Sequence, residues 1–159
     1  MGFALSDIAL STPAFDAMDP IPARHTGEGE DISPALEWRD APAGTQGFAV
    51  ICHDPDAPLV TPGGNYGFVH WVLYNIPGSV TSLQEGTSEY TEGQNDFGRT
   101  GYGGPMPPNG HGLHRYYFWI LALDQATDLE PGLTLWQLLE QLEPHILGMN
   151  RLVGTYERT

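Results

Sequence analysis

Residues Tyr66-Gly-Phe-Val-His-Trp-Val-Leu-Tyr-Asn-Ile76 form the clearest β-strand of the sequence, because aromatic and β-branched residues dominate them. Two further segments, Gly47–His53 and Arg115–Leu123, have the same apolar character and the length of buried strands. Phe3–Leu10 has an apolar spacing compatible with a strand, and Leu152–Tyr156 reads as a short final strand. Strands therefore dominate most of the chain.

One convincing helix follows late in the sequence. Thr134-Leu-Trp-Gln137 matches a capping box, and four leucines between Leu135 and Leu142 follow at the spacing of one helix face. Pro144 ends this helix, and a second helical turn is expected over His145–Asn150. The strands come first in the sequence, the helices come late and the two do not alternate, and this order favours a mainly β fold. We predict one domain over residues 1–159, an antiparallel two-sheet sandwich with short peripheral and C-terminal helices.

Composition excludes several classes of function. The 159 residues include 20 Asp and Glu but only six basic residues, all arginine, for a net charge of −14. Such a chain is repelled by phosphodiester backbones and anionic lipid surfaces, which argues against nucleic-acid binding. No apolar run is long enough to span a membrane and no signal peptide is visible, so we expect a cytoplasmic protein. A high-salt cytoplasm and the arginine bias of a GC-rich genome both account for the missing lysine.

Three polar segments adjoin the predicted strands. Asp54-Pro-Asp-Ala-Pro58 follows a buried strand, and its prolines stiffen the loop that holds both carboxylates. His70 lies within the strongest strand, where alternation places it on one face with Phe68, Val72 and Tyr74. On such a face a histidine is either a hydrogen-bonded core residue or a ligand contact.

The third segment, Gly98–Gly112, is rich in glycine and proline, so its backbone N–H groups can approach an anion closely. The strand after it presents His114, Tyr116 and Phe118 on one face. If these segments converge, two histidines with carboxylate neighbours that hold them protonated would suit a small anion such as phosphate. The single cysteine, Cys52, excludes an intrachain disulfide and a cysteine-based zinc cluster.

At these residues the sequence resembles the phosphatidylethanolamine-binding protein family, and more closely its prokaryotic branch, the Raf kinase inhibitor-like proteins. The order and spacing of the matching segments cover essentially the whole chain. They are Gly29–Pro34, Trp38, Asp54–Pro58, His70–Pro77, Asn95–Gly98, Gly101–Pro105, Pro107-Pro108, Gly112–Tyr116, His145–Leu147 and Leu152–Glu157.

The resemblance implies two antiparallel sheets and a small pocket at the sheet edge that takes phosphate-bearing head groups. Carried over position by position, its ligand-binding residues are Asp54, Asp56, Pro58, His70, Gly104, Pro108, His114 and Tyr116. The loop Gly103–Pro108 forms one wall, and Arg115 is a structural ion-pair partner.

Two positions depart from the usual pattern of the prokaryotic relatives. Met106 and the segment His25-Thr-Gly27 both lack a cysteine that is common there. His53 and His111 are read as exposed residues outside the pocket.

The first functional hypothesis is a non-catalytic binding protein for a small anionic or phosphorylated ligand, without a cofactor. The alternative is a metal-dependent or Asp/His acid–base hydrolase, in which His70, His111, His114, Asp54 and Asp56 supply zinc ligands or proton-transfer groups. A third reading is a regulator of a partner protein such as a kinase, and the resemblance also permits a homodimer.

Overall fold

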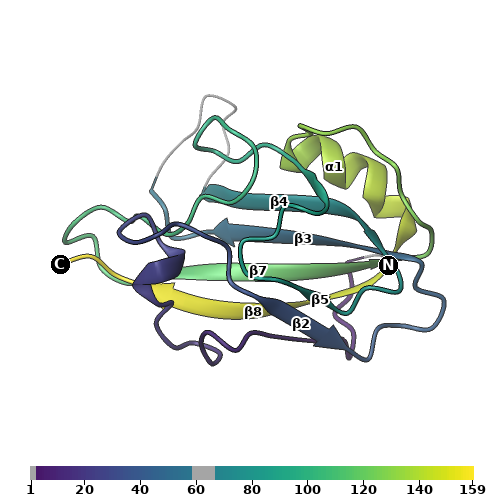
Figure 1. Cartoon of the computed structure of the whole chain (residues 1–159), viewed down its shortest axis with the longest axis horizontal. Helices are drawn as coiled ribbons and strands as arrows, with labels where there is room; N and C mark the ends of the chain where they lie inside the picture. Colours follow the sequence, from purple (N-terminus) through teal and green to yellow (C-terminus); the bar gives the residue numbers. More distant parts are fainter. Residues whose placement is uncertain (1–2, 59–66) are drawn as a thin grey trace.

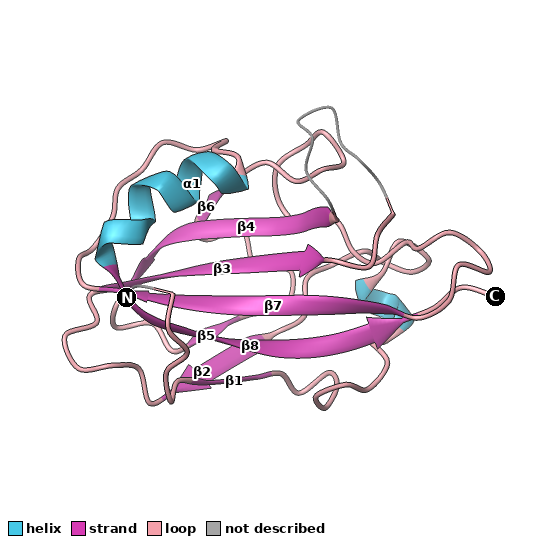
Figure 2. Ribbon diagram, turned by 180° about the vertical axis from the view of Figure 1, so that it is seen from behind, coloured by secondary structure: helices cyan, strands magenta, loops and turns pink. Residues whose placement is uncertain are grey.

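Two antiparallel sheets form the framework of the protein, whose computed structural model describes residues 3–58 and 67–159 (Figure 1 and Figure 2). The larger sheet has the strand order β6-β4-β3-β7-β8, and the smaller has the order β1-β2-β5. The strands are β1 (Ala9–Ser11), β2 (Leu36–Arg39), β3 (Gly47–Asp54), β4 (Phe68–Pro77), β5 (Ser82–Leu83), β6 (Thr91–Glu92), β7 (His114–Leu123) and β8 (Ile146–Tyr156). Short 3-10 turns occupy η1 (Ala23–His25) and η2 (Glu143–His145).

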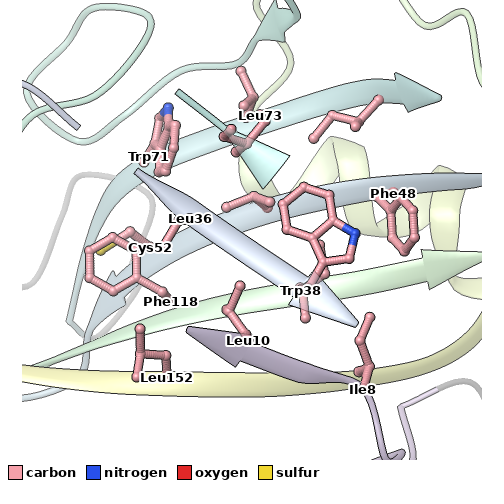
Figure 3. Packing of buried hydrophobic residues seen from close by; sticks show 14 of the residues in the cluster. Ile8, Leu10, Leu36, Trp38, Phe48, Cys52, Trp71, Leu73, Phe118 and Leu152 are labelled. Carbon is pink, nitrogen blue, oxygen red and sulfur yellow. The ribbon is translucent and has the colours of Figure 1, made fainter. Parts of the chain in front are cut away.

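The main core lies between the two sheets. Alternate residues of the central strands point toward the smaller sheet. Two pairs of neighbours across β3 and β7, Cys52 with Phe118 and Val50 with Ile120, contribute their side chains to this core. Figure 3 shows how side chains of the small sheet close this core from the other side, among them Leu10, Leu36 and Trp38.

Helix α1 (Leu135–Leu142) covers part of the opposite face of the large sheet (Figure 2). Its capping box is complete, since the Gln137 N–H donates to Thr134 Oγ1 at 3.2 Å and the Thr134 N–H donates to Gln137 Oε1 at 3.0 Å. The buried Leu138 and Leu142 anchor it in a second apolar cluster. No helix within residues 3–58 and 67–159 has the length and apolar character needed to cross a membrane.

The predicted fold class is confirmed, and so are the central strands. β3 extends one residue beyond the expected end, to Asp54, and β7 begins one residue earlier, at His114. Of the expected strand over Tyr66–Ile76, Tyr66 lies outside the described residues, and β4 begins at Phe68.

Two predicted elements are wrong. A second helical turn does follow α1 at Pro144, but it is the 3-10 turn η2 and does not extend over His145–Asn150, because β8 begins at Ile146 and pairs with the far end of β7, where Met149 lies opposite Leu121. The first strand does not run over Phe3–Leu10 but over Ala9–Ser11. The start of β8 pairs with the long β7, and β1 pairs with the short β2, so in both cases strand pairing rather than the local pattern sets the bounds.

Truncating Leu138 to alanine should lower the free energy of unfolding by about 2–5 kcal/mol, because the side chain is fully buried between α1 and the sheet. Trp136→Ala on the same helix is the matched control, since Trp136 is 70% exposed and its loss should change stability by about 0.5 kcal/mol or less. Urea denaturation measures both. Equal effects of the two substitutions would contradict the burial pattern of α1.

Candidate ligand-binding site

A cavity of about 260 Å³ lies at one end of the large sheet. At this end β3 stops and its antiparallel neighbours β4 and β7 begin (Figure 1). Antiparallel pairing brings these three strand ends together although they are distant in sequence. Among residues 3–58 and 67–159, those that line it are Asp54, Ala57, Pro58, Phe68, His70, Asp96, Phe97, Met106, Pro107, Pro108, His114 and Tyr116.

Six of the eight predicted site residues line this cavity, and two do not. Those that line it are Asp54, Pro58, His70, Pro108, His114 and Tyr116. Asp56 lies outside the lining because its carboxylate is held by Arg115, which donates from Nη2 at 2.8 Å, from Nε at 3.0 Å and from its backbone N–H at 2.9 Å. The Arg115 guanidinium lowers the pKa of Asp56, and Arg115 thus has the structural ion-pair role expected of it.

Gly104 also lies outside the cavity lining. A Cβ at this position would collide with the backbone of His25 and Thr26, so glycine is required there by close backbone packing. The Gly104 N–H donates to Asp31 Oδ1 at 2.7 Å instead of facing a ligand. The neighbouring Met106, Pro107 and Pro108 nevertheless supply the expected cavity wall.

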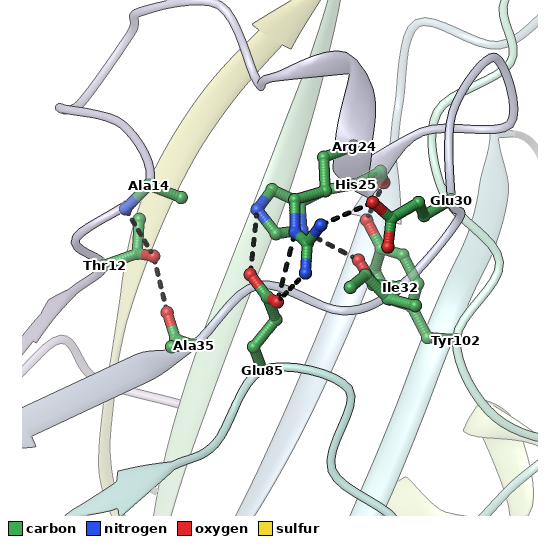
Figure 4. Close-up of polar contacts among 9 residues, drawn as sticks. All are labelled: Thr12, Ala14, Arg24, His25, Glu30, Ile32, Ala35, Glu85 and Tyr102. Atoms are coloured by element: carbon green, nitrogen blue, oxygen red, sulfur yellow. Dashed lines mark hydrogen bonds and ion pairs between the residues drawn. The ribbon is translucent and has the colours of Figure 1, made fainter.

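The segment around His25, drawn in Figure 4, is hydrogen-bonded to residues that come just before this wall in the sequence. The Tyr102 hydroxyl donates to the His25 carbonyl at 2.6 Å, and the Gly27 N–H donates to the Pro105 carbonyl at 2.9 Å. His25 is itself buried, with Nδ1 2.9 Å from the Ile32 carbonyl. His25 therefore has a structural role next to the wall.

Asp54 and His114 form the central polar contact of the site. The Asp54 Oδ2 accepts a hydrogen bond from His114 Nδ1 at 2.7 Å, and both side chains are buried. The other carboxylate oxygen, Oδ1, accepts the Asp56 backbone N–H at 2.8 Å. With both oxygens engaged, the carboxylate fixes the orientation of the His114 ring.

A β-bulge in β4 places the His70 side chain at the cavity. Cys52 is paired with Trp71 but His53 is paired with Val69, so His70 is the extra residue of β4. The expectation that His70 shares a face with Val72 is therefore wrong, because the bulge interrupts the alternation. The His70 ring packs against Tyr116, with 5.2 Å between ring centroids.

His70 is a neutral imidazole at pH 7. Burial lowers its pKa to about 4, and this outweighs the hydrogen bond from Nδ1–H to the Gly103 carbonyl at 2.6 Å. The expectation that carboxylate neighbours keep both site histidines protonated is thus wrong for His70, since the Asp54 carboxylate is bonded to His114. With Nδ1 donating, Nε2 of His70 is a hydrogen-bond acceptor.

Tyr116 lies between the two histidines on the floor of the cavity, with ring centroids 5.2 Å from His70 and 6.4 Å from His114. Burial, together with the charge of Asp54, raises the pKa of Tyr116 far above its ordinary value. The phenol therefore stays protonated and keeps its hydroxyl as a neutral hydrogen-bonding group.

Sequence reasoning missed the aromatic wall made by Phe68 and Phe97, whose ring centroids lie 4.7 Å apart. Asn95 positions Phe97 by accepting its backbone N–H at 2.9 Å, and Asp96 Oδ2 accepts the Val69 N–H at 2.7 Å. The segment 95–98 belongs to the resemblance to the phosphatidylethanolamine-binding proteins, which was the available signal for this wall.

His111 is exposed, as expected, but it contacts the site. Its Nδ1 lies 2.7 Å from His114 Nε2.

In the part of the chain that the structure describes, no group of three or more His, Cys, Asp or Glu side chains is arranged to hold a metal ion.

The pKa of His70 predicts a defined pH dependence of stability. The unfolded chain binds a proton here below its ordinary pKa of 6.5, whereas the folded protein does so only near 4, so stability should fall by ~3 kcal/mol as pH drops through this window. NMR titration of the ring gives its pKa directly, and urea denaturation from pH 7 to 4 gives the stability. His70→Gln should reduce this pH dependence, because the substituted side chain does not titrate in this range. A measured His70 pKa of about 6.5 or above would contradict the burial argument.

Comparison with known proteins places the chain in a family. A family model described as phosphatidylethanolamine-binding protein matches residues 11–157. The UPF0098 protein of Methanothermobacter thermautotrophicus is 42% identical over 156 residues, covering 94% of this chain and 98% of that protein. Among solved structures, a putative phosphatidylethanolamine-binding protein homolog from Chlamydia trachomatis, CT736, has a TM-score of 0.87 at 37% identity and covers 96% of this chain and 98% of its own. Escherichia coli YbcL has a TM-score of 0.86 at 28% identity, covering 97% and 100%. These archaeal and bacterial relatives fit the prokaryotic branch, and the chain belongs to the phosphatidylethanolamine-binding protein family.

Proposed function

We propose that the protein binds, without catalysis, a small organic molecule that carries a phosphate-like group, and that this group occupies the cavity between β4 and β7. The observation that supports this proposal is the convergence of His70, His114 and Tyr116 around one cavity of about 260 Å³. Three polar side chains from two non-adjacent strands, with apolar surroundings, are typical of a site that orients a small ligand.

The charges of the site favour a phosphate group that retains a proton. Asp54 and Asp96 contribute carboxylates, and no lysine or arginine stands among the described lining residues. A doubly charged phosphate would therefore meet like charges, whereas a singly charged one brings an O–H that can donate to the acceptor Nε2 of His70. The pKa that separates these two forms is about 6 for phosphate monoesters. The site is thus suited to the monoanion.

The apolar walls indicate what accompanies the phosphate. Phe68 and Phe97 form one wall, and Met106 with the two prolines that follow it forms another. Phe97 and Met106 are both partly exposed, so the apolar surface continues to the rim. A ligand with an apolar or aromatic group next to its phosphate would bury that group here.

Absence of catalysis is part of the proposal and is supported by the state of the potential nucleophiles. Cys52 is buried in the main core, and burial raises the pKa of its thiol well above the ordinary value. Among the described lining residues there is no serine, threonine, cysteine or lysine, and Tyr116 is held as a neutral phenol. A hydrolase, a regulated partner such as a kinase, a homodimer and a cytoplasmic location stay predictions from the sequence.

Phenyl phosphate and phenyl sulfate test the proposal sharply, because at pH 5.5 both carry one negative charge but only the phosphate retains an O–H. We expect phenyl phosphate at millimolar concentration to shift the NMR resonances of the His70 and His114 rings. Its affinity should exceed that of phenyl sulfate by about tenfold, the value of one hydrogen bond to a charged group. Its affinity should also fall between pH 5.5 and 8.

The matched control is His145→Gln, at a histidine paired with Asp124 rather than located in the cavity, which should bind like the wild type. His70→Gln should weaken binding of phenyl phosphate. Unchanged resonances of both site histidines at saturating ligand would reject the proposed function, and equal binding of the two esters would reject the role of the O–H.

A further inference from the structure

His114 has both ring nitrogens engaged in this structure. Its Nδ1 lies 2.7 Å from Asp54 Oδ2, and its Nε2 lies 2.7 Å from His111 Nδ1. The two imidazoles are steeply inclined, with centroids 4.9 Å apart and an interplanar angle of 67°. His114 is buried and His111 is exposed, so one ring covers the other from the solvent side.

The direction of these hydrogen bonds follows from their partners. An ionised carboxylate can only accept, so His114 donates from Nδ1–H to Asp54. With its proton on Nδ1, the His114 ring presents an acceptor at Nε2, to which His111 donates from Nδ1–H. His111 thus occupies the His114 nitrogen that would otherwise be available to a ligand.

The backbone that carries His111 is fixed, whereas its side chain is not enclosed. The Gly110 N–H donates to the Arg158 carbonyl at 2.9 Å, the His111 N–H donates to the Pro108 carbonyl at 3.1 Å, and Arg158 Nη1 donates to the Pro107 carbonyl at 3.1 Å. Gly110 and Gly112 adopt positive φ angles of 73° and 97°, which makes the tight turn around His111. The exposed ring can therefore leave His114 by side-chain rotation while the cavity wall stays in place.

We propose that His111 is a displaceable cap of the binding site, which satisfies His114 Nε2 in the free protein and gives way when a ligand phosphate takes its place. Because the single O–H of the monoanion donates to His70, the phosphate oxygen that replaces His111 accepts a hydrogen bond from His114, which takes up one proton at Nε2 from the solvent when the ligand binds. This inference rests on the proposed function. The cap competes with the ligand for one hydrogen-bonding atom, so it reduces the apparent affinity for every ligand. It also sets a chemical preference, because a group that cannot form a hydrogen bond with His114 Nε2 would displace the cap without replacing the bond that is lost.

The test compares His111→Ala with the wild type in calorimetric titration of phenyl phosphate at pH 5.5. Removal of the cap should raise the affinity by about 3–10-fold, because the ligand no longer has to break one hydrogen bond. His111→Asn places an amide close to the position of Nδ1 and should return the affinity toward that of the wild type. His145→Ala is the matched control and should have no effect.

NMR supplies a second readout on the wild-type protein. Saturation with phenyl phosphate should move the His111 ring nitrogens to the values of a free, solvated imidazole. Unchanged or weaker binding by His111→Ala, with binding by the wild type intact, would overturn the cap while leaving the proposed function in place. Absence of binding by both proteins would overturn the proposed function and the cap together.

Discussion

The hydrogen bond between the buried Asp54 carboxylate and His114 Nδ1, 2.7 Å long, is the constraint on which the site depends. It joins the last residue of β3 to the first residue of β7, beyond the final paired residues His53 and Tyr117. A buried carboxylate without a partner is strongly unfavourable, so each side chain requires the other in this position. The bond also determines which nitrogen of His114 carries a proton, and hence what Nε2 can offer to His111 or to a ligand.

The two site histidines have different roles because their surroundings differ. His70 bonds to a neutral carbonyl and is desolvated, which keeps it uncharged, whereas His114 bonds to a carboxylate. The site therefore combines a neutral acceptor with a ring that an acidic neighbour orients. This difference, rather than overall charge, is why the proposed ligand of a chain with a net charge of −14 is a phosphate group that carries its own proton.

Much of the fold follows from local patterns. The strands β3 and β7 and the helix α1 were predictable because continuous apolar runs and a capping box specify them within a few residues. The start of β8 at Ile146 was not, because that segment becomes a strand only by pairing with the long β7. The bulge at His70 was also invisible, since it reflects how β3 and β4 align rather than any residue pattern.

The site was predictable to a similar degree. The predicted residues near the strand end that carries Asp54 line the cavity. Asp56 does not, because its carboxylate points toward Arg115, a partner that is distant in the sequence. Gly104 is explained by backbone packing that only the folded chain creates. His111 carried no sequence signal for its contact with His114, since an H-x-x-H spacing in a glycine-rich loop does not specify where the rings meet.

The most direct test of the account is a crystal structure of the protein grown with saturating phenyl phosphate. The account predicts phosphate oxygens within about 2.7–3.2 Å of both His70 Nε2 and His114 Nε2, the phenyl ring against Phe97, and the His111 ring rotated into solvent. A phosphate bound elsewhere, with His111 still on His114, would contradict it.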